Sequence, residues 1–246
     1  MAITRRDVVV GTGGLAGALG LYGGWRLLVP SGTLRYRLTV EVEVDGEIRT
    51  GTSVGEATYT SMRRLPFLLT PPFVSDLKAE ATVVDLGPRG LLFVLIGRLR
   101  HPPGYRTVAS NYLAAIIPWA FGFGEETIRS ISSLNKTVDL AGDLLPPMIK
   151  FGSHLLPESA QFVDPNNLER SFGPNVRLRR VRLATTHEPI TNQIEKVLPW
   201  LPGWQGTVDH NAWIGGVPVL RSPDLGRVHF TQGLPSALDR IFSFRG

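Results

Sequence analysis

The sequence predicts a mainly β protein with helical insertions (α+β), built as an antiparallel sheet or a sandwich-like body behind an N-terminal membrane helix. Two observations predict this class: apolar and polar residues alternate strictly over residues 34–44, and an uncharged stretch of 18 residues, 8–25, opens the chain. The 246 residues are 43% hydrophobic and 19% charged, which supplies a core and is not typical of disorder. We divide the chain into a leader, residues 1–32, and one β-rich body, residues 33–246.

The leader resembles a bacterial twin-arginine signal. Arg5 and Arg6 precede the uncharged stretch, which contains seven glycines and is therefore only mildly hydrophobic. Val8 and Val9 replace the usual Phe-Leu pair of such signals. The alternative, an ordinary helix packed inside a soluble protein, is disfavoured because glycine is a poor helix former.

The end of the leader indicates an anchor rather than a cleaved signal. No small-x-small cleavage triplet is present there, and Trp25 and Arg26 are typical of residues at a membrane interface. The positive-inside rule keeps Arg5 and Arg6 in the cytoplasm. The prediction is a protein of the bacterial inner membrane with its body in the periplasm.

The body opens with a predicted β-hairpin. Residues 34–44 form the first strand, Asp45-Gly46 is a dipeptide that accepts positive φ in a tight turn, and residues 47–60 return. Gly51 and Gly55 in the second strand indicate bulges or a close backbone approach.

The next segments predict a loop and a second strand pair. Residues 61–76 contain three prolines, so we expect a loop whose apolar residues cap the core or face a partner or the membrane. Residues 78–86 and 91–97 follow as a strand pair. The continuous apolar run at 91–96 predicts a strand that is covered on both faces.

The remaining elements are shorter. An apolar stripe predicts a helix over residues 107–121, which Pro118 should kink or end early, and a second helix follows over 125–134. Later expectations are a loop at 135–147, a strand at 148–152, a helix from Asp164-Pro165 to Phe172, a strand at 176–186, a helix at 191–198 and short strands after 205.

Several function classes are excluded or disfavoured. Without cysteine the chain has no disulfide, cysteine nucleophile, iron–sulfur cluster or thiolate zinc site. The body carries 23 basic and 20 acidic residues, a balance that does not predict nucleic-acid binding. We find no paired-histidine metal motif, nucleophile elbow or phosphate-binding loop, and we expect no cofactor. Asp209, His210 and His229 are the weak candidates for a metal or acid–base site, against the simpler interpretation of loop histidines.

Two clusters are candidates for contact with a partner or with lipid. The strand at 176–186 carries Arg177, Arg179, Arg180 and Arg182, and its apolar phase shifts between Leu178 and Val181, which predicts a bulge. These arginines either grip phosphate or carboxylate groups, or form a solvated strand face. Trp200 and Trp204 either pack in the core, stack on carbohydrate or peptide, or lie at a membrane interface.

Several blocks of the sequence are similar to a family of bacterial proteins that has no assigned activity. The blocks are Tyr36–Glu43 (YRLTVEVE), Arg49–Val54, Val163–Leu168, Phe172–Leu178 and Glu188–Leu201, the last with the pattern EPIT…IEKVLPWL. The resemblance implies common ancestry and adds no activity, ligand or site residue.

We therefore expect a non-catalytic, membrane-anchored periplasmic domain that makes protein contacts, as an accessory or assembly subunit of an inner-membrane complex would. Its expected partners are the inner membrane, through the leader, and another protein. The alternative is an exported enzyme or a protein that binds a ligand or lipid.

Overall fold

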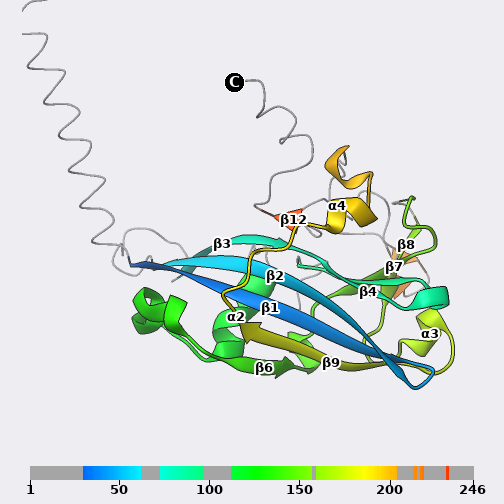
Figure 1. Ribbon diagram of the computed structural model, residues 1–246, viewed down its shortest axis with the longest axis horizontal. Coiled ribbons are helices and arrows are strands. Elements are labelled where there is room, and N and C mark those ends of the chain that lie inside the picture. The colour runs from blue at the N-terminus through cyan, green and yellow to red at the C-terminus, as the bar shows by residue number, and fades with distance from the viewer. Residues whose placement is uncertain are drawn as a thin grey trace, which may run out of the picture.

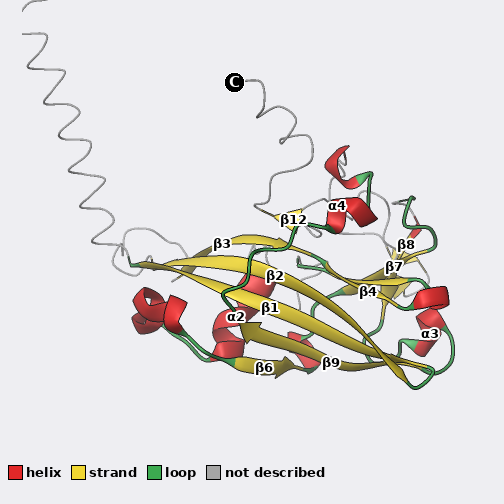
Figure 2. Ribbon diagram, in the orientation of Figure 1, coloured by secondary structure: helices red, strands yellow, loops and turns green. Residues whose placement is uncertain are grey.

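The computed structural model is mainly β, with helical insertions between strands (Figures 1 and 2). It describes residues 30–61, 73–96, 112–156 and 159–203, together with the short pieces 213–214, 217–218 and 231–232. The predicted membrane helix lies outside these residues. Inside them, no helix has both the length and the apolar character that crossing a bilayer requires.

The larger sheet is built around one long hairpin. Its strands are, in spatial order, β12 (Thr231–Gln232), β3 (Phe73–Glu80), β2 (Glu47–Ser61), β1 (Ser31–Val44), β9 (Val176–Thr185) and β6 (Thr137–Leu140). All described pairings in it are antiparallel. Asp45 and Gly46 join β1 to β2 with φ of 51° and 89°, so the predicted hairpin and turn are confirmed.

The smaller sheet is also antiparallel. Its order is β4 (Thr82–Asp85), β5 (Leu91–Val94), β7 (Met148–Phe151) and β8 (Ala160–Val163), with η1 (Gly87–Arg89) between β4 and β5. β10 (Trp213–Ile214) and β11 (Val217–Pro218) form a separate two-stranded pair. The chain passes from the larger to the smaller sheet at Ala81, so the strand predicted at 78–86 is interrupted there. The predicted loop at 61–76 is also too long, because β3 begins at Phe73.

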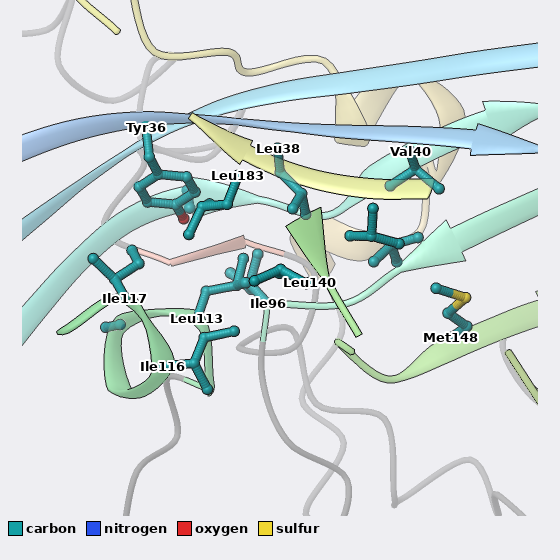
Figure 3. Packing of buried hydrophobic residues seen from close by; sticks show 14 of the residues in the cluster. Tyr36, Leu38, Val40, Ile96, Leu113, Ile116, Ile117, Leu140, Met148 and Leu183 are labelled. Atoms are coloured by element: carbon teal, nitrogen blue, oxygen red, sulfur yellow. The ribbon is translucent and has the colours of Figure 1, made fainter. Parts of the chain in front are cut away.

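β5 separates two hydrophobic clusters, as its unbroken apolar run predicts. Leu92 and Val94 belong to the main cluster, which fills the space between the larger sheet, the smaller sheet and α2 (Tyr112–Phe121). Figure 3 shows this packing, with Leu38 and Leu183 of the larger sheet near Leu113 and Ile117 of α2. Phe93 belongs to the second cluster, on the other face, which α4 (Ile194–Val197) and η5 (Leu201–Gly203) cover.

Pro118 lies inside α2 without ending it. Proline has no N–H, so the carbonyl of Ala114, four residues earlier, loses its usual helical donor. The hydroxyl of Tyr59 donates to that carbonyl at 2.8 Å. Of the two predicted effects of Pro118, a kink or an early end, the early end is wrong, because the helix continues to Phe121. A side chain of β2 supplies the donor that the proline lacks.

Other local predictions are only partly right. The helix expected at 125–134 is the 3-10 helix η2 (Glu125–Ser133), and the loop expected at 135–147 contains β6 and the 3-10 helix η3 (Gly142–Leu144). The helix expected to begin at Asp164 begins instead at Glu169, as α3 (Glu169–Phe172). The Asp164 carboxylate accepts the N–H of Asn166 in a turn that precedes this helix. The helix expected at 191–198 is the single turn α4.

Gly51 and Gly55 mark close approaches, and β1 and β2 pair without a bulge at either position. A β-carbon on Gly51 would lie 2.2 Å from the carbonyl oxygen of Val83 in β4. On Gly55 it would lie 2.5 Å from the hydroxyl of Tyr36. The first contact brings β2 directly against the smaller sheet.

Candidate functional site

β9 has one edge that is only partly covered. Along its whole length it pairs with β1, from Val176 opposite Val44 to Thr185 opposite Tyr36. On the other side β6 pairs only with residues 181–184. Among the described residues, 176–180 therefore have no strand partner on that side, and we call them the open edge of β9; they lie at the end of the sheet near the β1–β2 turn.

The open edge carries backbone groups that point away from β1. Asp45 N–H donates to the carbonyl of Asn175 at 3.0 Å, so the backbone carbonyl of Asn175 points towards the β1–β2 hairpin. In an antiparallel pair, the backbone N–H and C=O of successive residues point alternately towards the partner strand and away from it. The N–H and C=O of Val176 and Leu178 therefore point away from β1. Among the residues that the structure describes, none hydrogen-bonds to these groups.

A groove of about 520 Å³ runs along this edge. Its opposite wall is formed by the chain around η3 and by the turn that precedes α3. The lining residues are Leu140–Gly142, Leu145, Pro165–Glu169 and Val176–Val181. The open edge thus forms one wall of a groove that is open to solvent.

The bulge that the sequence predicts is present at the centre of this edge. The register of β9 against β1 shifts between Glu41 and Val42, which face Arg180 and Leu178, so Arg179 is the additional residue. Arg177, Arg179 and Arg180, which lie within four residues of one another around the bulge, all line the groove.

Each of the four candidate arginines has a carboxylate partner in the protein. Arg177 Nε lies 3.4 Å from Glu169, Arg179 pairs with Glu43, Arg180 Nη2 lies 2.7 Å from both carboxylate oxygens of Glu41, and Arg182 Nε lies 2.7 Å from Asp139. The hydrogen bond from Arg182 lowers the pKa of Asp139, and the same bond raises the pKa of Arg182. The arginines differ in exposure: the side chain of Arg177 is 68% exposed and that of Arg180 is 36%.

Trp200 is half-buried at the second cluster. Its ring packs edge-on against Phe151, with centroids 5.8 Å apart, and its indole N–H donates to the carbonyl of His154 at 2.7 Å. Phe151 in turn packs against Phe93 of β5. Trp200 therefore covers the outer face of the smaller sheet.

The other candidate residues lie outside the described part of the chain. These are Arg5, Arg6, Trp25 and Arg26 of the leader, Trp204, and the weak metal or acid–base candidates Asp209, His210 and His229. Across the described ranges, no three side chains of His, Asp or Glu converge as a metal site would require.

A second groove, of about 420 Å³, lies at the other end of the sheet. Hydroxyl and amide side chains dominate its lining, together with the Arg35–Glu56 ion pair and His187. Burial raises the pKa of the hydroxyls of Tyr36 and Tyr59, which belong to the main hydrophobic cluster.

Sequence reasoning found the arginines and the bulge but missed the open edge. The edge exists because β6 is short and ends at Leu140, within the segment expected to be a loop. Comparison with models of protein families, with curated proteins and with solved structures finds no match to this chain. The family resemblance of the sequence blocks therefore stays a prediction.

Proposed function

We propose that this chain is a non-catalytic, membrane-tethered periplasmic domain that binds a partner protein by adding one strand of the partner to β9. Such a domain would serve as an accessory or assembly subunit of an inner-membrane complex. The observation that carries the proposal is the open edge of β9, with the outward backbone groups of Val176 and Leu178 above a groove.

The chemistry of the edge favours an extended polypeptide. A row of alternating N–H and C=O groups is matched by the backbone of another strand, as in recognition by strand addition. Five residues of open edge are about 16 Å long, enough for a short peptide strand. The groove beside the edge would receive the side chains of that strand.

The charges along the groove favour acidic residues in the partner. Arg177 is mostly exposed and its contact with Glu169 is long, at 3.4 Å, so a carboxylate of the partner can replace Glu169 with little loss. The guanidinium fork can also donate to both oxygens of one carboxylate.

A second copy of this chain is a poorer partner for the same edge. Two antiparallel β9 edges paired about a twofold axis would bring the arginines of one copy close to those of the other. Like charges across paired strands are destabilising. The bulge and arginines therefore protect the edge against self-association while leaving it open to an acidic strand.

Site-specific photocrosslinking in living cells tests the proposal. We expect the full-length protein with Arg177→p-benzoylphenylalanine to form a discrete covalent adduct with one protein. Addition of Leu178→Pro, which removes an outward N–H without removing a hydrogen bond to β1, should abolish the adduct. Thermal unfolding of the double variant checks that the fold survives.

Arg49 supplies the matched control. It lies near the same end of the sheet, is exposed and pairs with Glu47, but it does not line the groove. A photoreactive residue at position 49 should give no adduct. An equal adduct at both positions, or none at position 177, would refute strand addition at this edge.

A further inference from the structure

The described fold begins at Pro30, just before the end of the segment assigned to the leader. Pro30 is already buried, and its carbonyl accepts the N–H of Ser61 at 2.9 Å. A β-carbon on Gly32 would lie 1.9 Å from the carbonyl oxygen of Ile128 in η2, so the first residues of β1 are packed tightly. Only residues 26–29 separate the uncharged stretch from the fold, so a fully extended chain spans at most about 18 Å between residues 25 and 30.

This short connection determines which end of the body faces the membrane. β1 starts at the left end of the sheet in Figure 1 and turns into β2 at the right end. If the leader is a membrane anchor, as the proposed function requires, the left end lies against the bilayer. The open edge of β9 lies towards the other end, about ten residues or some 33 Å along β1.

The C-terminal turn of α2 belongs to the membrane end. Tyr59 pairs with Gly32 of β1, and its ring contacts Phe123, with centroids 5.3 Å apart. Phe123 N–H donates to the carbonyl of Pro118 at 3.1 Å. This series of contacts leads from the first residues of β1 to Trp119.

Trp119 is the most exposed large apolar residue in the described chain. Its side chain is 72% exposed, whereas Leu113, Ala114 and Ile117 of the same helix are buried. α2 contains no charged residue over its ten positions. Indole rings favour the headgroup region of a bilayer, where the apolar ring and the N–H are both accommodated.

We infer that Trp119 inserts into the headgroup region of the membrane that holds the leader. This inference rests on the proposed function, because it needs the tether. It adds a second membrane contact, which fixes how the body stands on the bilayer and directs the open edge of β9 away from it. The lipid surface is the occupant because it is within reach of the end where the leader joins the fold.

Spin labelling of the full-length protein tests the inference, and the natural chain has no cysteine to remove. Trp119→Cys and Ile48→Cys are compared in vesicles of phosphatidylethanolamine and phosphatidylglycerol. Ile48 is 52% exposed and lies beside the turn at the opposite end, so it is the matched control. The ratio of collisions with oxygen to collisions with a nickel chelate should be several-fold higher at position 119 than at position 48.

A second measurement keeps the natural indole. Quenching of tryptophan fluorescence by brominated lipid should be lower in Trp119→Phe than in the unmodified protein. Equal collision ratios at positions 119 and 48, in protein that stays with the vesicles through a carbonate wash, would overturn the inference alone. Release of the protein by that wash would overturn the tether, and the inference with it, while the crosslink at position 177 tests the β9 edge separately.

Discussion

The two ends of the β1–β2 hairpin are stabilised by different interactions. At the end where β1 begins, backbone packs against backbone, aromatic rings meet in the core, and the Tyr59 hydroxyl completes α2. At the turn end, Arg89 joins three separate segments: its guanidinium contacts the carboxylate of Asp45 and the carbonyl of Phe172, and Asp45 also accepts from Asn175.

The difference indicates that the two ends of the hairpin have different roles. Apolar and backbone contacts exclude water and define one geometry, which would suit the end next to the proposed tether. Solvent-exposed ion pairs contribute little stability, and a partner's charged group can replace one of their members. This suits the end that carries the open edge of β9.

The largest effect is expected from a single methyl group at the start of β1. Gly32→Ala places a β-carbon on the carbonyl of Ile128, so η2 must move away from the sheet, and we expect a loss of about 3 kcal/mol in the free energy of unfolding. Gly46→Ala at the turn meets no atom within 4 Å and adds only the strain of positive φ, about 1 kcal/mol. Denaturant unfolding measures both, and equal losses would contradict the comparison.

The next prediction compares the loss of the hydroxyl group at two buried tyrosines of neighbouring strands. Tyr59→Phe leaves the carbonyl of Ala114 without a donor, which should cost about 2 kcal/mol. The Tyr36 hydroxyl is buried and has no hydrogen-bond partner among the residues that the structure describes, so Tyr36→Phe should be neutral or stabilising. The same unfolding measurement applies, and a larger loss for Tyr36→Phe would refute the role assigned to Tyr59.

A smaller effect is expected at the turn end. Arg89→Ala removes the contacts to Asp45 and Phe172 and should cost about 1 kcal/mol, because the ion pair is partly exposed. Arg49→Ala removes a more exposed pair with Glu47 and serves as the control, with no measurable change. A loss for Arg89→Ala as large as that for Gly32→Ala would show that this end is also rigidly packed.

The smallest effect concerns pH. The pKa of Asp139 is lowered in the folded protein from its ordinary value of 3.8, so its pair with Arg182 stabilises the fold above that value. The contribution should be lost as the pH falls through the lower, folded pKa. Thermal unfolding between pH 5 and pH 2, at roughly physiological salt, should therefore show a slightly weaker pH dependence for Asp139→Asn than for the unmodified protein. An unchanged dependence would show that the pair is fully screened.

The sequence predicted the features that neighbouring residues decide. Strict alternation over residues 34–44 defined β1, Asp45-Gly46 defined the turn, and the shift in phase after Leu178 located the bulge. Each of these follows from period-two geometry or from the φ that a residue tolerates. The arginines on β9 were also visible, but their carboxylate partners Glu41, Glu43 and Asp139 come from other strands and were not.

Tertiary structure alone decided the rest. The carbonyl of Ala114, which Pro118 leaves without its helical donor, accepts from a hydroxyl of β2 that lies 55 residues before it in the chain. Whether β9 has an open edge depends on where β6 stops pairing, and whether Trp119 is exposed depends on which face of α2 meets the sheets. Local pattern determines the conformation and amphipathic character of a strand, because those follow from its own residues. Contacts between distant segments determine which edges and side chains remain uncovered.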